Sequence, residues 1–455
     1  MRKNQLKFLL LCLSVFGLLF FAGCTLPNLP FLPKSPQPSP GNVTLKYWGL
    51  WETKNNIQPL IDEYQKAHPN VTIEYEERSP KFYYETLKSR LISDSAPDIA
   101  RMHLTWVPKL SANLAALPAS VMDSATFNST FYPVVSKWCT QVDQIYCLPL
   151  MYDGLALVYN QSLFEKAGIA NPPKTWEEFK EMAQKLTVKD GQGKIIQAGA
   201  ALGTAENVTE FSDLLGLLML HNGVQFQDSK TGKVTFQETI SPDGRNTGAE
   251  AVEFYTQFAK GKGQVWDPSL GESTAAFAAG KVAMIFASSW RLQNVLDANP
   301  ALKVVATAVP QLTTPEGGLT NINWASFWVE GVAQQSTHQA EAWDFLKFIT
   351  EKEQLLNFQK TVTTTSAARL FGEIYPRQDI SSLLLSDLYL EPYVTGAPAA
   401  ETWYFCDRTW DGLLNDTIKG FLSQAVASVV NGGSAESSLN VAAQSIQALF
   451  DQKDE

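Results

Sequence analysis

The sequence predicts an α/β protein in which short strands alternate with amphipathic helices from residue 42 onward. Two observations support this fold class. Apolar residues recur at helical spacing in several segments, and short alternating or continuous apolar runs lie between those segments. Such alternation is typical of sheets covered by helices. More than 400 of the 455 residues follow position 41, enough for two or three domain-sized units.

The first 23 residues have the layout of a secretory signal. A positively charged start precedes the largely apolar run 8–22, which is shorter than the ~20 residues that a membrane-spanning helix needs. Ala22 and Gly23 precede Cys24 in a pattern that resembles the bacterial lipobox, where signal peptidase II cleaves and leaves a lipidated cysteine. We expect a lipoprotein signal peptide over residues 1–23 and a lipid on Cys24. The alternatives are a signal anchor and a cleaved signal in which Cys24 is incidental.

Residues 24–41 form a proline-rich stretch. Six prolines, with Ser and Asn among the residues around them, prevent a helix or a packed core and favour polyproline-II geometry. At about 3.1 Å per residue, this stretch forms a semi-rigid stalk of roughly 50 Å. We expect the protein to work outside the cytoplasm, anchored by lipid at the outer face of the cytoplasmic membrane or in the periplasm.

Charge and motifs argue against several classes of protein. The formal charge is −10 and no basic run follows the signal, which argues against nucleic acid as a partner. The chain has no nucleophile elbow, zinc-protease motif, P-loop or dinucleotide-binding glycine motif, and its four histidines are scattered. Carboxylate spacing alone nominates no glycosidase pair. We therefore expect a protein that is not an enzyme and uses neither a metal nor a cofactor. We also expect a monomer.

The first elements follow in order from Asn42. The segment VTLKYWGLW predicts a strand, and the alternation of Val71, Ile73 and Tyr75 predicts a second one. Between them, an apolar helix face is spaced i, i+3, i+4 and i+7 and consists of Ile57, Leu60, Ile61 and Tyr64.

Later segments continue the alternation. TWEEFKEMAQKL opens with a capping box formed by Thr175 and Glu178. The continuous apolar run 282–287 predicts a strand covered on both faces. EAWDFLKFI and LNVAAQSIQALF predict two further amphipathic helices. The helix predicted over TWEEFKEMAQKL is expected to bury Trp176, Phe179, Ala183 and Leu186.

Two cysteines flank a predicted hairpin. KWCTQVDQIYCLPL suggests two short strands around residues 141–144, which allows Cys139 and Cys147 to pair. An exported protein meets oxidising conditions, so we expect a disulfide that contributes roughly 2–3 kcal/mol. A metal-binding pair is the weaker alternative because no histidine lies close in sequence. Cys406 is then left over and is expected to be buried.

Several segments, taken in order, resemble one family. They are LKYWGLWE, LIDEYQKAHPNVTIEYE, LISDSAPDIARMH, LPLMYDGLALVYNQSLFEKAGIANPPKTWEEFKEMAQKL, FAAGKVAMIFASSWRL and QAEAWDFLKFITEKEQ. Together they resemble the extracellular solute-binding proteins of ABC importers, in the sugar-binding group of lipoproteins that includes maltose-binding protein. The fourth segment is the most specific match. The cysteine hairpin and the sequence Ala287-Ser288-Ser289-Trp290, where the family usually has a glycine before the tryptophan, depart from the group.

The resemblance implies a two-lobe periplasmic-binding-protein fold with a central cleft and interlobe crossover strands. Crossovers are expected near residues 151–155, 305–310 and 363–370. Lobe one is then 42–153 plus 309–366, and lobe two is 154–308 plus 367–455.

The resemblance also implies a function. We expect capture of a sugar or oligosaccharide by lobe closure and its delivery to the transmembrane subunits of an ABC permease. A surface-anchored carbohydrate hydrolase and a ligand-binding sensor for a membrane receptor remain the alternatives.

Sugar binding suggests which residues line the cleft. Aromatic rings cover the C–H faces of sugars, and short polar groups at strand ends bind the hydroxyls. We expect Trp290 and Trp324 to stack on the ligand from opposite lobes and Asp153 to accept hydrogen bonds from it. The full set of candidates is Trp51, Glu52, His103, Trp106, Asp153, Glu206, Asn207, Trp290, Asn323, Trp324, Trp403 and Tyr404. Core packing is the alternative for each tryptophan, and we assign Trp48, Trp176, Trp343 and Trp410 to the core.

Overall fold

The computed structural model describes residues 41–241, 243–365 and 372–452. The expected signal peptide, the lipidation site Cys24 and the proline-rich stalk up to residue 40 lie outside the described residues. Within the described ranges, no helix is both long and apolar enough to cross a membrane.

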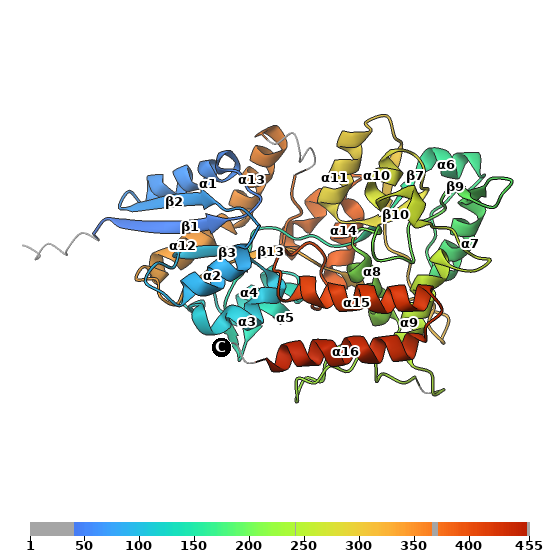
Figure 1. The fold of residues 1–455 in the computed structure, drawn as a ribbon. Helices are drawn as coiled ribbons and strands as arrows, with labels where there is room; N and C mark the ends of the chain where they lie inside the picture. Colours follow the sequence, from blue (N-terminus) through green and yellow to red (C-terminus); the bar gives the residue numbers. More distant parts are fainter. Residues whose placement is uncertain (1–40, 242, 366–371, 453–455) are drawn as a thin grey trace, which may run out of the picture. The chain divides into compact units, whose positions relative to one another are not determined.

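A five-stranded sheet organises the first part of the chain (Figure 1). Its order is β2-β1-β3-β13-β6; β1 is parallel to β2 and β3, and β13 is antiparallel to β3 and β6. The strands are β1 Val43–Gly49, β2 Val71–Glu77, β3 Ile99–His103, β6 Leu148–Pro149 and β13 Trp328–Val332. Both N-terminal strands predicted from the sequence are confirmed, and β2 alternates buried and exposed residues as expected.

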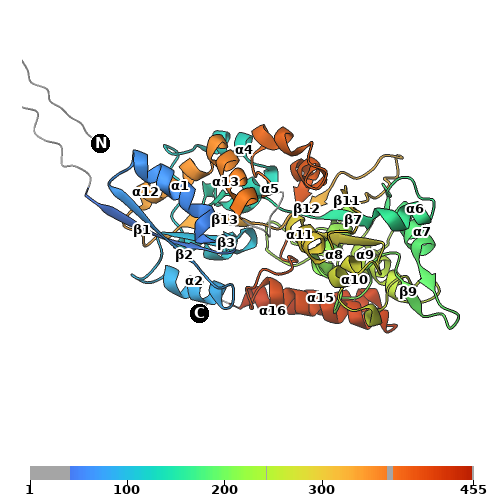
Figure 2. The ribbon, with the colours of Figure 1, turned by 90° about the horizontal axis from the view of Figure 1, so that it is seen from above.

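Helices cover both faces of this sheet. The helix α1 buries the predicted face of Ile57, Leu60, Ile61 and Tyr64 and packs against α12 and α13. Figures 1 and 2 show α1 and α2 on opposite sides of the sheet. The helices of this part are α1 Lys54–Ala67, α2 Tyr83–Leu91, α3 Val107–Leu110, α4 Ser124–Thr130, α5 Pro133–Cys139, α12 Gln339–Ile349 and α13 Lys352–Thr365. The predicted amphipathic helix EAWDFLKFI is thus confirmed as α12.

A three-stranded antiparallel sheet, β10-β7-β11, organises the second part. Its strands are β7 Ala156–Asn160, β10 Met284–Ala287 and β11 Val304–Thr307. All four residues of β10 are buried, as the continuous apolar run predicted. The capping box of α7 is also confirmed, because the Glu178 N–H donates to the Thr175 hydroxyl over 3.1 Å and the Glu178 carboxylate accepts from the Thr175 N–H over 3.3 Å.

Helices pack around this second sheet and extend to the C-terminus. They are α6 Gln161–Lys166, α7 Trp176–Leu186, α8 Phe211–His221, α9 Thr247–Thr256, α10 Ser273–Ala278, α11 Ser289–Ala298, α14 Glu391–Gly396, α15 Asn415–Val430 and α16 Ala435–Asp451. The last two lie side by side and pack against α9 (Figures 1 and 2). The predicted C-terminal amphipathic helix is therefore confirmed as α16. The remaining short strands are β4 Thr140–Gln141, β5 Gln144–Ile145, β8 Val188–Lys189, β9 Ile195–Gln197, β12 Asn323–Trp324 and β14 Ala400–Glu401.

The disulfide between Cys139 and Cys147 is confirmed, with a Cα–Cα distance of 5.3 Å. The hairpin is shorter than predicted, because α5 continues through Cys139 and only β4 and β5 pair across the turn. Val142 and Asp143 form that turn with φ angles of 48° and 62°. Cys406 is buried and unpaired, as expected.

The chain crosses between the two sheets where the candidate cleft lies. Pro149 belongs to the five-stranded sheet and Ala156 to the three-stranded sheet, so the chain crosses between them in a span that contains the first expected crossover at 151–155. The return differs from the expected position at 305–310, because β11 still pairs with β7 there and Gln311 still bridges to Thr175. We propose that the return crossover lies at 322–327, which moves the second lobe boundary from 308/309 into this segment.

Two contacts place this return segment beside the first crossover. The Leu155 N–H donates to the carbonyl of Trp324 over 3.1 Å, and the Ser326 N–H donates to the carbonyl of Asp153 over 3.1 Å. The two crossovers therefore run side by side. The third expected crossover, 363–370, lies largely outside the described residues.

Candidate ligand-binding cleft

A cavity of about 420 Å³ lies where the crossovers pass between the two sheets. Its lining comes from the chain after β1, the end of β3, both crossovers, the N-terminal ends of α8 and α11, and a loop that precedes α15. We call this cavity the cleft. Strand ends and connecting loops therefore supply its side chains, as α/β folds place their ligand sites.

Three tryptophans form an aromatic wall on one side of the cleft. The ring centroids of Trp51 and Trp328 are 5.8 Å apart, and those of Trp51 and Trp410 are 6.2 Å apart. Trp51 has a φ of 68°, a left-handed conformation that is uncommon for a residue with a side chain. Its buried indole N–H has no hydrogen-bond partner in the protein. The wall thus offers apolar ring surface and an unused donor.

Trp290 faces the cleft from the N-terminal end of α11. It is 44% exposed, and the guanidinium of Arg291 lies 4.3 Å from its ring centroid. An exposed indole at a cavity is unusual for so large an apolar side chain. Trp290 therefore has the accessibility that a ring-stacking residue requires.

Two buried carboxylates hold the first residues of α11. Asp153 accepts hydrogen bonds from the N–H and the hydroxyl of Ser289, both over 3.0 Å, and Glu210 accepts from the N–H and the hydroxyl of Ser288 over 2.9 and 2.6 Å. Negative charge at a helix N-terminus is favourable because it satisfies the free N–H groups and the helix dipole. These contacts fix the backbone that carries Trp290.

Asp153 is therefore engaged inside the protein. Besides the two bonds from Ser289, it accepts a bond of 2.8 Å from the N–H of Gly154. Burial raises the pKa of Asp153 to about 7, although these three hydrogen bonds favour its charged form. Asp153 lines the cleft as expected, but its principal contacts join the first crossover to α11.

Asp213 and Asp407 form a second network in the lining of the cleft. The N–H of Asp407 donates to Asp213 over 2.8 Å, and the N–H of Glu210 donates to Asp407 over 3.0 Å. Burial raises the pKa of Asp213 well above its ordinary value. Burial also opposes the ionisation of Asp407, but the ammonium of Lys419, 2.5 Å away, leaves the pKa of Asp407 below its ordinary value.

Five of the predicted residues line the cleft: Trp51, His103, Asp153, Trp290 and Trp324. Burial lowers the pKa of His103 to about 3, so this side chain is neutral. Its Nδ1 lies 2.8 Å from the hydroxyl of Thr105 and its Nε2 lies 3.2 Å from that of Ser326.

Trp324 differs from the expectation of a stacking ring. It is 0% exposed, and its indole N–H donates to Asp213 over 2.8 Å. Its ring lies so close to α8 that a Cβ added at Gly216 would be 2.5 Å from it. Because the ring is enclosed by the core, Trp324 has no free face for a ligand. Its neighbour Asn323 is buried outside the cleft, in β12.

Four more predicted residues are buried away from the cleft. Glu52 accepts from the side chain of Asn56 over 3.1 Å, and the indole N–H of Trp106 donates to Asp411 over 3.0 Å. Trp403 stacks on Phe226 with centroids 5.0 Å apart, and Tyr404 belongs to the same aromatic cluster. These side chains follow strands or turns as the candidates should, but they are buried.

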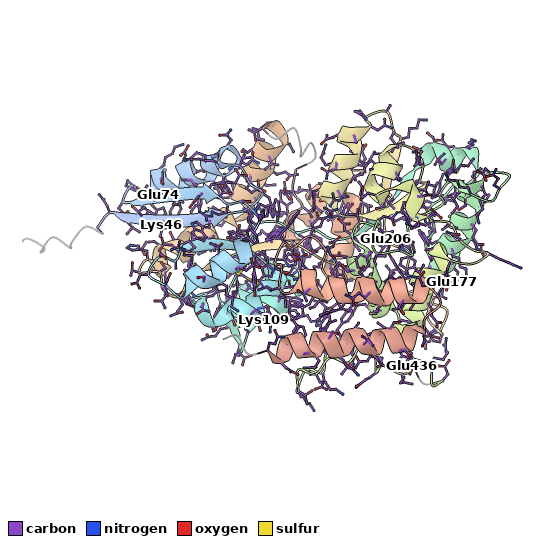
Figure 3. The ribbon with its side chains drawn as sticks, in the orientation of Figure 1. Lys46, Glu74, Lys109, Glu177, Glu206 and Glu436 are labelled. Carbon is purple, nitrogen blue, oxygen red and sulfur yellow. A yellow bond between two sulfur atoms is a disulfide. The ribbon has the colours of Figure 1, made fainter. Side chains whose placement is uncertain are left out.

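Glu206 and Asn207 line a separate cavity of about 350 Å³. Glu206 is exposed and is labelled in Figure 3. The Asn207 side chain is engaged locally; its Nδ2 donates to the carbonyl of Gly271 over 2.7 Å.

Several residues of the cleft are absent from the predicted set. Trp410 is not the core residue that the sequence predicts, because it is 45% exposed in a loop with a φ of 58°. The surrounding sequence CDRTWDG is rich in turn-forming residues and could have indicated that loop. Trp328 begins β13, and no sequence signal separated it from a core tryptophan. The core assignments of Trp48, Trp176 and Trp343 are confirmed. Other lining residues that were missed are Thr53, Asn56, Glu210, Asp213, Ser288, Asn294, Ser326, Asp407 and Arg408.

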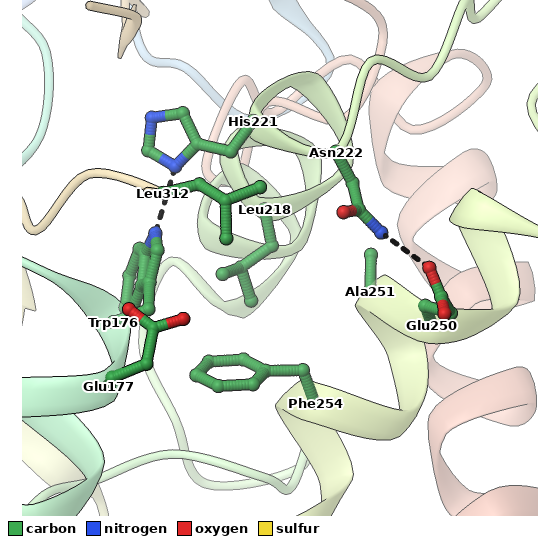
Figure 4. A pocket seen from close by; sticks show the side chains of 9 residues that line it. All are labelled: Trp176, Glu177, Leu218, His221, Asn222, Glu250, Ala251, Phe254 and Leu312. Atoms are coloured by element: carbon green, nitrogen blue, oxygen red, sulfur yellow. Dashed lines mark hydrogen bonds between the residues drawn. The ribbon is translucent and has the colours of Figure 1, made fainter. Parts of the chain in front are cut away.

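A third, smaller cavity of about 170 Å³ lies between α7, α8 and α9 (Figure 4). There, Trp176 donates its indole N–H to Nδ1 of His221 over 2.9 Å, and Nε2 of His221 lies 2.9 Å from the carbonyl of Ile322. Burial lowers the pKa of His221 to about 4, so it is neutral. These bonds satisfy both ring nitrogens, which assigns His221 a structural role.

Comparison with known proteins supports the same architecture. The cyclic α-maltosyl-1,6-maltose binding protein from Arthrobacter globiformis superposes with a TM-score of 0.72 at 20% identity, covering 90% of this chain and 99% of that one. The multiple sugar-binding protein of Streptococcus mutans is 22% identical over 340 residues, which are 73% of this chain and 78% of that protein. The sn-glycerol-3-phosphate-binding periplasmic protein of Yersinia enterocolitica is 23% identical over 380 residues, 77% of this chain and 82% of that protein.

The fold is thus the two-lobe fold of periplasmic solute-binding proteins. The family model of bacterial extracellular solute-binding proteins matches residues 51–355, which include both crossovers and most residues of the cleft. Because that match spans well over half of the 455 residues, the chain belongs to the bacterial extracellular solute-binding protein family.

Proposed function

We propose that this protein captures a neutral sugar or oligosaccharide in the cleft, without chemical change, and delivers it to an ABC permease. The observation that carries the proposal is the lining of the cleft, where four accessible or half-buried tryptophans stand beside hydroxyl, amide and carboxylate groups. The four tryptophans are Trp51, Trp290, Trp328 and Trp410.

This combination suits a sugar. Indole rings bury the C–H faces of a sugar ring, and each fully buried apolar side chain is worth about 1.5–3 kcal/mol. Asn294 and Ser326 add short polar groups for hydroxyls to the lining. A maltotriose-binding protein of Pyrococcus abyssi, a cyclo/maltodextrin-binding protein and a protein with mannotriose bound are similar to this chain in sequence or in fold, which supports the same ligand class.

The charges of the cleft argue against a phosphate ester. Asp153, Glu210, Asp213, Glu373 and Asp407 face the cavity, whereas Arg408 is the one Lys or Arg among its lining residues in the described ranges. Burial raises the pKa of Asp153, Glu210 and Asp213, whereas the pKa of Asp407 lies below its ordinary value, so a phosphate in this site meets the charge of Asp407 with Arg408 as its basic partner. A neutral ligand avoids this repulsion.

The carboxylates also argue against a hydrolase. A glycosidase needs two carboxyl groups directed at the scissile bond. Here Asp153 and Glu210 direct their oxygens at the first backbone and side-chain donors of α11. They are therefore better suited to hold the helix than to transfer protons to a ligand.

Ligand capture requires contacts to both lobes. Trp51 and Trp328 belong to the five-stranded sheet side, and Trp290 belongs to the side of the three-stranded sheet. A ligand that contacts both sides stabilises the closed state by differential affinity. We propose that Cys24 carries the lipid that keeps this event at the membrane, as a secretory signal and a stalk imply.

Thermal shift and calorimetry test the proposal. The panel is maltose, maltotriose, mannobiose, mannotriose and sn-glycerol 3-phosphate, and a true ligand at 100 times its Kd adds about 2.7 kcal/mol of stability. Trp328→Ala should reduce the shift, whereas Phe82→Ala, which removes an exposed aromatic side chain outside the cleft, should preserve it. A shift with the phosphate alone would reject the neutral-sugar assignment, and shortened products would indicate a hydrolase.

Uptake separates import from sensing. Cells that lack the protein should lose uptake of the labelled ligand. Retained uptake with loss of a ligand-dependent signal would favour the sensor.

A further inference from the structure

The cleft shares a wall with the cavity that contains Glu206. Asp407, Arg408 and Trp410 line both spaces. We call the second space, of about 350 Å³, the side cavity. Each of the two volumes lies within the ~300–1,000 Å³ range of small-molecule sites.

Two chain segments build the shared wall, 208–211 and 407–410. Thr209 and Phe211 line the side cavity, while Glu210 between them lines the cleft. Glu210, Arg408 and Trp410 have φ angles of 60°, 56° and 58°, which side-chain-bearing residues rarely adopt. Backbone strain of this kind persists where surrounding contacts enforce it, and it gathers at ligand clamps.

Hydrogen bonds enforce the conformation on both sides of Trp410. Before it, the N–H of Asp407 donates to Asp213 over 2.8 Å. After it, Asp411 accepts from the indole of Trp106 over 3.0 Å and from the side chain of Asn415 over 2.7 Å. Trp410 is therefore held between two anchors with 45% of its surface exposed.

The side cavity offers chemistry similar to that of the cleft. It has the ring of Trp410 and the exposed carboxylate of Glu206, which is labelled in Figure 3. Arg408 adds a buried Nε–H that has no partner in the protein. Acidic residues outnumber basic ones around the cavity, which disfavours an anionic ligand and is compatible with a neutral ligand that has many hydroxyl groups.

We infer that the side cavity is a further subsite of the same binding protein. It binds the additional sugar units of an oligosaccharide whose other end occupies the cleft and whose chain passes over the exposed ring of Trp410, which lines both spaces. The ligand class is then a neutral oligosaccharide longer than a disaccharide. This inference rests on the proposed function.

The test is a chain-length series titrated by calorimetry. Two series are used as probes, α-1,4-linked glucose oligomers and β-1,4-linked mannose oligomers, each from two to six units. For the series that binds, we expect the Kd of the parent protein to fall at least 10-fold between two and six units.

Two variants test whether the side cavity is the source of that gain in affinity. Ala205→Trp fills the side cavity, and Glu206→Ala removes its exposed carboxylate. Ala205→Trp should bring the Kd for six units within 2-fold of the parent's Kd for two units, and Glu206→Ala should weaken six-unit binding 3- to 10-fold. Neither should change the Kd for two units. Glu74→Ala, which removes an exposed carboxylate on β2, is the matched control and should change no Kd (Figure 3).

The outcomes are distinguishable. The side-cavity subsite would be overturned, with sugar binding intact, if the Kd of the parent protein were independent of chain length. The same holds if the variants leave the Kd for six units unchanged or weaken binding equally at every length. If no member of either series binds the parent protein, both proposals fail. Circular dichroism checks the fold of Ala205→Trp. If that variant is unfolded, Glu206→Ala decides, because its side chain is exposed.

Discussion

Replacing two tryptophans of the cleft separately should give opposite results. Trp324→Ala should destabilise the protein, and Trp290→Ala should weaken ligand binding. Both residues line the same cavity, but Trp324 is 0% exposed and Trp290 is 44% exposed. The contrast follows from burial rather than from residue type.

The magnitudes follow from the contacts. Truncating a buried tryptophan costs about 3–5 kcal/mol. Asp213, which accepts the indole N–H of Trp324 over 2.8 Å, also loses a donor and remains buried. Trp324→Phe keeps most of the ring and removes that donor, so it should cost about 1–3 kcal/mol. Trp290→Ala should cost less than about 1 kcal/mol of stability, because surface truncations are usually small.

For ligand binding, the substitution of Trp290 should have the larger effect and that of Trp324 the smaller. Loss of the Trp290 ring should remove about 1–3 kcal/mol of ligand contact, which weakens the Kd roughly 5- to 150-fold. Trp324→Phe should leave the Kd within about 3-fold, since the enclosed ring contributes no stacking face.

Urea unfolding followed by circular dichroism gives the stabilities, and calorimetry with the oligosaccharide that binds gives the affinities. If Trp324→Ala unfolds at the parent's urea midpoint while its Kd rises more than 10-fold, Trp324 is a stacking residue and its burial has been misjudged. A Trp290→Ala variant that binds like the parent would remove Trp290 from the site.

Three further predictions concern pH, the disulfide and the anchor. Burial raises the pKa of Asp153 from 3.8 to about 7 in the folded state, so the folded protein keeps a proton that the unfolded chain releases. The stability that this group contributes is therefore lost as pH rises from about 4 to 7. Urea titrations across that range should show that the unfolding free energy of Asp153→Asn depends less on pH than that of the parent. Thiol counting on denatured, unreduced mature protein lacking Cys24 should find one thiol, that of Cys406, because Cys139 and Cys147 are joined; a count of three would contradict this. Cys24→Ala should release the protein from membranes or leave it uncleaved, and an unchanged membrane fraction and mature mass would reject lipidation.

Local sequence patterns determined the elements of this fold. The face spaced i, i+3, i+4 and i+7 became α1, and the capping box became the start of α7, because both depend on side chains within one or two helical turns. The disulfide could also be predicted from the sequence, because nearby strands joined by a tight turn bring Cys139 and Cys147 together. Each of these inferences depends on residues that are close in the chain.

The composition of the cleft depended on distant packing. Trp324 and Trp290 carry the same side chain near similar turns, yet α8 covers one and leaves the other open. Trp410 faces the cleft because Asp213 and Trp106, some 200 and 300 residues earlier in the chain, anchor the loop around it. Burial of a large ring depends on which elements pack over it, and a local sequence pattern does not specify which distant elements those are. The sequence alone therefore determined the fold class and the family resemblance, whereas the tertiary structure decided which aromatic rings remain free to meet a ligand.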